Sequence, residues 1–389
     1  MKGEISGKTF FGYSFIVGMY WAYFASFVGF ITTYLLACGL SSGTLSIVLA
    51  VFMLSSFIGS FFWGGRCDRA GSNRKIFIPE YMAAFAVAML IFFLADKNVM
   101  LAACLYPVYG FLGSPLGSNL DAWMLKGFNR NAAVFGRARS LGSVGYAVMM
   151  LGLGQLINRV GYHLIPIAAV ICFACVLAAA FIIPENAGRG VRTTATPGSP
   201  RDLLKIRPYV FLVALLFLCG LASSPINNLK IVILQSVGGD VSVLGIDAFI
   251  GVMLQAVLIF MTGRLYKIPA YVRLLLATVF ELGMVTLTYL AVSPVMIILG
   301  TVLNNISYGI LMPTYRQMTE ASVSGSLKNT AHAMCDAMFG SFAGVVALLY
   351  SGSMMDAFGA RSVALLGMGI MLVPVVMSAV ALLRNRREA

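Results

Sequence analysis

Long apolar segments follow one another along almost the whole chain, and this succession constrains the fold more than any other feature of the sequence. A helix needs about twenty apolar residues to cross the hydrocarbon layer of a membrane. Twelve segments meet this length, at 10–36, 43–63, 76–95, 99–125, 137–157, 163–183, 209–235, 243–263, 274–292, 295–315, 331–352 and 361–383. Because lipid cannot satisfy backbone polar groups, these segments predict an all-α membrane protein of twelve transmembrane helices.

The charge of the chain fits this prediction and excludes a nucleic-acid-binding protein. Only 11% of the residues are charged, against about 25% in soluble domains. The net charge is +13, but most of the 27 lysines and arginines flank the apolar segments on the side of the two termini. The opposite loops carry only Lys97, Arg159 and Arg361. The positive-inside rule therefore predicts that both termini are cytoplasmic.

One glycine motif recurs at the ends of four apolar segments. Its copies are Gly64-x-x-x-Asp68-Arg69-x-Gly71, Gly154-x-x-x-Asn158-x-x-Gly161, Gly263-x-x-x-Lys267 and Gly352-x-x-x-Asp356-x-x-Gly359. The first copy pairs with the third, and the second with the fourth, about half a chain length apart, which indicates an internal repeat of six segments. We therefore expect a six-helix bundle at 1–183, a polar cytoplasmic linker at 184–207, and a second six-helix bundle at 208–389, facing each other across a central cavity.

One carboxylate and one guanidinium lie inside the apolar segments near the middle of the first half. Asp121 lies in the fourth segment and Arg139 opens the fifth. A charge at bilayer depth costs roughly 2.5–3.5 kcal/mol on the insertion scale, so it is retained where it meets a partner or a solute. The two residues lie at similar depth, and we expect them to meet. Arg139, Ser143 and Tyr146 follow i, i+4, i+7 spacing and share one helix face.

The stretch from Asp121 to Tyr146, with F-G-R-A-R followed by G-x-V-G-aromatic, resembles the lactose permease group of oligosaccharide:proton symporters. Gly64, Asp68, Arg69 and Gly71 likewise resemble the signature loop of the major facilitator superfamily, which implies a loop that gates conformational change. The resemblance implies that Asp121 and Arg139 bind sugar hydroxyls and that Tyr146 stacks on the sugar ring. It also implies a bacterial inner-membrane protein. This chain has Asp and Tyr where the lactose permease has Glu and Trp.

Isolated polar residues interrupt the apolar segments of the second half. Asn227 and Asn305 are amides that can hydrogen-bond a solute, and we expect them to take part in binding. The arginine and the histidine–glutamate pair with which the lactose permease couples protons have no counterpart that aligns. Glu281 and Asp336 are therefore the candidates for carrying a proton, and permanent pairing of either with a basic residue is the alternative.

The leading hypothesis is a secondary transporter that moves a sugar or glycoside together with a proton by alternating access. The alternatives are a symporter of nucleosides or aromatic carboxylates, and an efflux pump for amphipathic compounds. The sequence contains no hydrolase, metalloprotease or nucleotide-binding motif, and two histidines cannot build a multi-histidine metal site. We therefore expect no enzyme, no cofactor and no metal, with a solute, protons and the lipid bilayer as partners, and a monomeric protein.

Overall fold

The computed structural model describes residues 7–70, 72–129, 131–183, 200–323 and 327–388, and within these ranges the chain is built from helices. Their order is α1 (Gly7–Ala37), α2 (Ser42–Ala70), α3 (Asn73–Ala95), α4 (Val99–Gly113), α5 (Leu116–Gly127), α6 (Ala132–Val160), α7 (Leu164–Ile182), η1 (Pro200–Lys205), α8 (Arg207–Asn228), α9 (Lys230–Ser236), α10 (Val241–Phe260), α11 (Thr262–Leu265), α12 (Ala270–Tyr289), α13 (Pro294–Ser322), α14 (Lys328–Asp336), η3 (Ala337–Phe342), α15 (Ala343–Phe358) and α16 (Ser362–Glu388). The prediction of an all-α protein is confirmed.

Eleven helical spans in the described residues are long and apolar enough to cross a membrane. The predicted segment 243–263 corresponds to α10, whose described apolar part, Val241–Gln255, is shorter than the other spans. Most of the predicted linker 184–207 lies outside the described residues, and its last part contains η1.

Three of the predicted spans are interrupted helices rather than continuous ones. The span at 99–125 is divided into α4 and α5 at Ser114 and Pro115, where the proline lacks the N–H that a continuous helix needs. The span at 209–235 is divided at Leu229, between α8 and α9. The span at 331–352 consists of α14, the π-helical segment η3 and α15. The polar stretch S-S-P-I-N-N-L-K at 223–230 indicates the break at Leu229 in the sequence, whereas the apolar pattern continues through the other two breaks.

Polar side chains accept backbone hydrogen bonds at the start of two helices. Ser72 accepts a hydrogen bond from the Lys75 N–H at 3.1 Å at the start of α3. Asp240 accepts hydrogen bonds from the Ser242 hydroxyl at 2.6 Å and the Val243 N–H at 3.1 Å at the start of α10. Partial burial acts to raise the pKa of Asp240, but these hydrogen bonds outweigh it and leave the pKa below its usual range.

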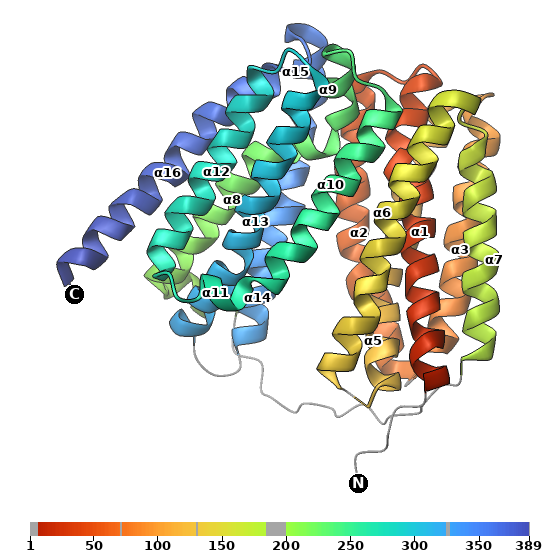
Figure 1. Ribbon diagram of the computed structural model, residues 1–389, viewed down its shortest axis with the longest axis horizontal. Helices are drawn as coiled ribbons and strands as arrows, with labels where there is room; N and C mark the ends of the chain where they lie inside the picture. Colours follow the sequence, from red (N-terminus) through yellow and green to blue (C-terminus); the bar gives the residue numbers. More distant parts are fainter. Residues whose placement is uncertain (1–6, 71, 130, 184–199, 324–326, 389) are drawn as a thin grey trace. The chain divides into compact units, whose positions relative to one another are not determined.

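The described chain forms two compact units. The first contains Met1–Ser41, Val51–Arg192 and Asp240–Met253, and the second contains Ser42–Ala50, Thr193–Gly239 and Leu254–Ala389. In the first unit α1 packs against α6 (Figure 1). Helix α1 also packs against α7, and α3 packs against α4. In the second unit α12 packs against α13 and α16, and α8 packs against α15 and α16 (Figure 1).

Two copies of the glycine motif make similar contacts. A Cβ on Gly154, in α6, would lie 3.0 Å from the Val241 carbonyl oxygen at the start of α10, within the first unit. A Cβ on Gly352, in α15, would overlap the Ser42 carbonyl oxygen and Ser46 at the start of α2, within the second unit. In each pair, the absence of a side chain therefore lets one helix approach the first turn of another.

The polar residue and the last glycine of these two copies also have matching roles. Asp356 accepts a hydrogen bond from the Gly43 N–H at 2.8 Å, and Asn158 donates to Asp240. Gly161 has φ +115° and Gly359 has φ +89°, immediately after the ends of α6 and α15. Left-handed backbone of this kind ends a helix at little cost only when the residue is glycine. In these two copies, the motif therefore ends one helix and packs that end against the first turn of another helix.

The first copy of the motif differs from its predicted loop. Gly64 and Arg69 belong to α2, which continues to Ala70, because the apolar pattern underestimates the length of this helix. A Cβ on Gly64 would meet nothing within 4 Å, so this glycine does not mark a close helix contact among the described residues. The side chain of Asp68 and all of Gly71 lie outside the described residues.

Candidate solute-binding site

The two charges of the first unit contact each other. Asp121 is in α5 and Arg139 is in the first third of α6. Arg139 Nε lies 3.0 Å from Asp121 Oδ1 and donates a hydrogen bond to Oδ2 at 3.1 Å. The side chains keep 27% and 31% of their surface exposed, respectively, although both helices are apolar spans. The pair is neutral as a whole and both side chains are partly exposed, although Asp121 Oδ1 itself is buried without a hydrogen-bond partner among the described residues.

The ring of Trp21 holds the guanidinium from one side. Arg139 Cζ lies 4.4 Å from the centre of this ring, which is within the range of a cation–π interaction. Gly142 makes room for it, because a Cβ there would lie 2.6 Å from Trp21 Cδ1 and 2.8 Å from Arg139 Nη1. Trp21 Nε1 is buried and has no hydrogen-bond partner in the described part of the chain. In the sequence, Trp21 is one of several aromatic residues in the segment 10–36, and nothing there distinguishes it as a partner of Arg139.

Ser143 and Tyr146 lie one and two turns further along α6, and both are half-buried. Near them α6 runs close to α1, because a Cβ on Gly145 would overlap the carbonyl oxygen of Gly18. Asp121, Arg139, Trp21, Ser143 and Tyr146 thus belong to three neighbouring elements, α1, α5 and α6, of one unit. Together they offer hydrogen-bond acceptors, donors and aromatic surface.

A buried carboxyl group near this pair was missed by the sequence analysis. Glu80, in α3, is fully buried and accepts a hydrogen bond from Asn119 Nδ2 at 2.8 Å. Its other oxygen, Oε1, is buried without a hydrogen-bond partner among the described residues. A charged carboxylate left in this state would be costly, so we expect Glu80 to hold its proton. In the sequence, Glu80 could have been singled out because it is an acid inside the apolar segment 76–95.

Glu281 is surrounded by neutral hydrogen-bonding groups of the second unit. Its side chain, in α12, is 3% exposed. Asn304 Nδ2 donates to Oε1 at 3.1 Å. The hydroxyls of Ser223 and Ser307 lie close to the carboxyl but donate to the backbone oxygens of Cys219 and Ala277. These three polar side chains come from α8 and α13. Within the described chain, the partners of Glu281 thus include no cation.

Asp336 has a different environment. The hydroxyl of Tyr315 donates to Asp336 Oδ1, and Arg316 Nη2 lies 3.2 Å from Oδ2. Both partners are in α13, beyond or at the end of the predicted segment 295–315, because the helix continues to Ser322. The predicted alternative of pairing with a basic residue is therefore the arrangement seen for Asp336.

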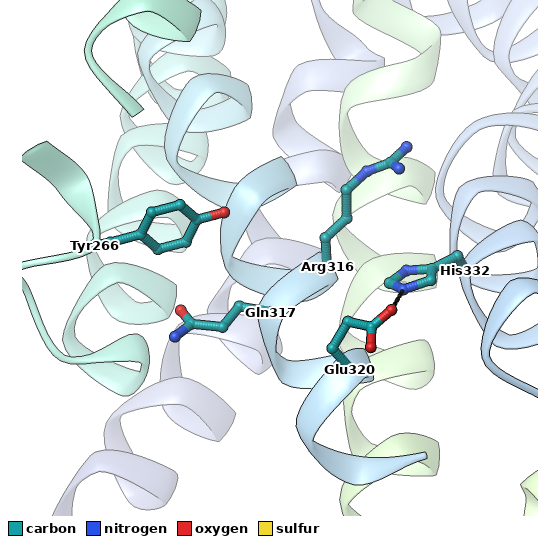
Figure 2. A pocket seen from close by; sticks show the side chains of 5 residues that line it. All are labelled: Tyr266, Arg316, Gln317, Glu320 and His332. Carbon is teal, nitrogen blue, oxygen red and sulfur yellow. Dashed lines mark hydrogen bonds and ion pairs between the residues drawn. The ribbon is translucent and has the colours of Figure 1, made fainter. Parts of the chain in front are cut away.

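A pocket of about 500 Å³ lies beside this ion pair in the second unit. It is lined by Tyr266, Arg316, Gln317, Glu320 and His332 (Figure 2). His332 Nε2 lies 3.0 Å from Glu320 Oε1, as the dashed line in Figure 2 shows. Glu320 also pairs with Lys328 at 2.5 Å. These ion pairs join α13 to α14, which makes the cluster a link between two helices.

The two amides predicted to bind a solute, Asn227 and Asn305, have different surroundings. Asn227 is exposed near the end of α8. Asn305 donates from Nδ2 to the carbonyl oxygen of Thr301 at 2.9 Å, one turn earlier in α13. No cluster of three or more metal-ligating side chains occurs among the described residues.

Comparisons with known proteins identify the type of fold. The model of the MFS_1 like family matches residues 11–366. No curated protein sequence matches the chain. A mutant of the nucleoside transporter NupG superposes with a TM-score of 0.82 at 12% identity, covering 96% of this chain and 99% of that one. An auto-inhibited POT family peptide transporter gives a TM-score of 0.71 at 12% identity, with 97% of each chain covered.

A bacterial homolog to the human lysosomal transporter Spinster, in an inward-facing and unoccupied conformation, gives a TM-score of 0.65 at 13% identity. The superposition covers 98% of this chain and 96% of that one. At these identities the likeness shows the fold, and the expected major facilitator fold is confirmed.

Proposed function

The chain belongs to the MFS_1 like family and is a multi-pass membrane transporter rather than an enzyme, and from this premise we propose that it moves a sugar or glycoside together with a proton. The site is the Asp121–Arg139 pair with Trp21, Ser143 and Tyr146. Alternating access exposes it in turn to the two sides of the bacterial inner membrane.

The donors that Arg139 leaves free are the observation that carries this proposal. Its Nε is used by Asp121, whereas neither terminal nitrogen has a hydrogen-bond partner among the described residues. Two such nitrogens form a planar fork that can donate to adjacent hydroxyls. Asp121 carries lone pairs that can accept from a hydroxyl next to them. Neighbouring hydroxyls that both donate and accept are the chemistry of a sugar.

The same pair disfavours an aromatic carboxylate as solute. Asp121 lies within 3.0 Å of the guanidinium, so an anion bound there would face a carboxylate as well as a cation. A nucleoside is the second candidate, because it combines ribose hydroxyls with a flat base and the site has aromatic surface from Trp21 and Tyr146. Competition of labelled uptake by a panel of sugars, glycosides, nucleosides and aromatic acids distinguishes these classes.

Neutralising the pair tests the binding site. We expect Asp121→Asn and Arg139→Gln each to lower uptake into proteoliposomes by about 10- to 100-fold, since each removes charge-assisted hydrogen bonds to the solute. The double variant Asp121→Asn/Arg139→Gln should also fail to transport. Its melting temperature should nevertheless lie closer to that of the wild type than either single variant does, because no charge is left without a partner.

Arg137→Gln is the matched control, because Arg137 is an exposed arginine only two residues earlier in α6. It should transport like the wild type. Normal uptake by the double variant would mean that the pair only stabilises the fold, and the proposed site would be abandoned.

In this proposal, Glu281 carries the proton that is coupled to transport. A carboxyl surrounded by neutral donors can change its protonation without breaking an ion pair, whereas Asp336 is held by Arg316. Glu281→Gln should abolish accumulation against a gradient while exchange of solute across the membrane continues. Glu320→Gln, which removes an exposed acid of α13, should keep both activities. Accumulation driven by a pH gradient in Glu281→Gln would exclude this residue as the proton carrier.

A further inference from the structure

A cavity of about 960 Å³ opens among α8, α12, α13 and α16 of the second unit. It is distinct from the pocket of Figure 2, although Gln317 borders both. Gln317 accepts a hydrogen bond from Arg273, a buried residue. Helices α8 and α12 begin at this end of the unit, and α13 and α16 finish there.

The rim of this cavity is basic. Arg207 is the first residue of α8, and Arg384 lies in the last part of α16. Both side chains are exposed, and neither has an ion-pair partner within the described ranges. Tyr271 and Asn385 add hydrogen-bonding groups, and no lining residue is acidic. The N-terminal ends of α8 and α12 are offset by the C-terminal ends of α13 and α16, so the positive charge of the rim comes from the two arginines.

The floor of the cavity is apolar. It is lined by side chains of α8 and α16, among them Phe211, Leu372, Val376 and Val380. Leu372 is 55% exposed and Val376 is 59% exposed, although both lie in a transmembrane span. Exposed apolar side chains on such a span are suited to contact with lipid. The cavity is therefore a groove that passes from two arginines onto an exposed apolar surface of α16.

We propose that this groove binds one anionic phospholipid, its phosphate on Arg207 and Arg384 and its acyl chains along α16. Basic pockets between transmembrane helices bind anionic headgroups because charge attraction adds to burial of the chains. By the predicted orientation the lipid belongs to the cytoplasmic leaflet. A free phosphate would use only the rim, and the extended apolar floor would remain uncovered.

Native mass spectrometry of the purified full chain tests the proposal. Phosphatidylglycerol and phosphatidylcholine of equal chain length are titrated separately, and the ratio of their affinities is measured in each variant. The wild type should prefer phosphatidylglycerol. In Arg207→Gln/Arg384→Gln this preference should fall by about 30-fold, because each arginine near the membrane surface contributes about fivefold and the two contributions multiply. Arg264→Gln, an exposed arginine outside the groove, should keep the preference.

Filling the floor is an independent test of the acyl-chain part. Val376→Trp should weaken binding of both lipids, whereas Leu365→Trp, on an exposed position of the same helix outside the groove, should not. Glycerol 3-phosphate, the headgroup without chains, should not displace phosphatidylglycerol at equal concentration. Displacement by it, equal affinity of the wild type for both lipids, or a preference that survives in the double arginine variant would each overturn the proposal.

Discussion

Arg139 is contacted by two groups of different chemistry, an acid at Nε and the indole ring of Trp21, whose centre lies 4.4 Å from Cζ. A lysine could satisfy Asp121 but has no flat face to lie on Trp21 and no second pair of donors. The use of arginine at this position therefore follows from its geometry as much as from its charge.

Glu80 gives a prediction at the same scale. If its carboxyl holds a proton, Glu80→Gln replaces one neutral group by another of similar shape, and the melting temperature in detergent should change little. Glu80→Ala removes the partner of the buried Asn119 and should destabilise the protein by about 1–3 kcal/mol. Equal destabilisation by both substitutions, measured by thermal unfolding, would indicate that Glu80 is ionised and that its charge is required.

Sequence reasoning reached some of these residues and not others. The depth of Asp121 and Arg139 in their segments predicted a meeting, and the structure places them 3.0 Å apart. Glu80 was missed, although it is an acid in an apolar segment. The hydrogen-bond partner of Glu281 could not be predicted, because Asn304 comes from another helix whose rotation about its axis composition does not fix.

At the scale of elements, the apolar segments located the helices well and their ends poorly. Helix α13 extends seven residues past its predicted end, and α2 likewise continues into the predicted loop. Polar residues can continue a helix beyond the membrane, so a loss of apolar character does not end it. The second and fourth copies of the glycine motif contain the last turns of α6 and α15 because Gly161 and Gly359 adopt left-handed backbone there.

The close contact at Gly352 is directly testable. Gly352→Ala places a methyl group against Ser46 and the backbone of Ser42, and backbone cannot yield as a flexible side chain can. We expect a loss of about 1–3 kcal/mol in the free energy of unfolding. Gly369→Ala, in α16, is the control, because a Cβ there meets nothing within 4 Å. It should be neutral or stabilising, since alanine favours helix by about 1 kcal/mol over glycine. Similar melting temperatures of the two variants would refute the contact.

At the scale of the whole molecule, the number of membrane crossings decides whether the two termini lie on the same side of the membrane. Eleven spans are long and apolar by their described residues, and α10 must cross as well if both termini share one side. The cation distribution predicts that both termini are cytoplasmic. The apolar periodicity and the repeat therefore predicted the fold class, whereas substrate and coupling depend on side chains that only tertiary packing brings together.

Reporter fusions test this orientation. Green fluorescent protein joined after Ala389 should fluoresce, and alkaline phosphatase joined there should be inactive, because the phosphatase needs disulfides that form outside the cytoplasm. Alkaline phosphatase joined in the loop at Lys97 should be active. An active phosphatase at the C-terminus would show that one apolar segment, with α10 the first suspect, does not cross.

The wide turn of η3 affects how this chain can be compared with distant relatives. A π-helical segment contains one residue more than an α-helix would need to link the same two ends. A relative with an uninterrupted helix would therefore align with this chain only through a gap in the middle of a membrane span, where alignments rarely admit one. Without that gap, every equivalence drawn on one side of Ala337–Phe342 would be displaced by one position, and Asp336 or Gly352 would be matched to the wrong neighbour.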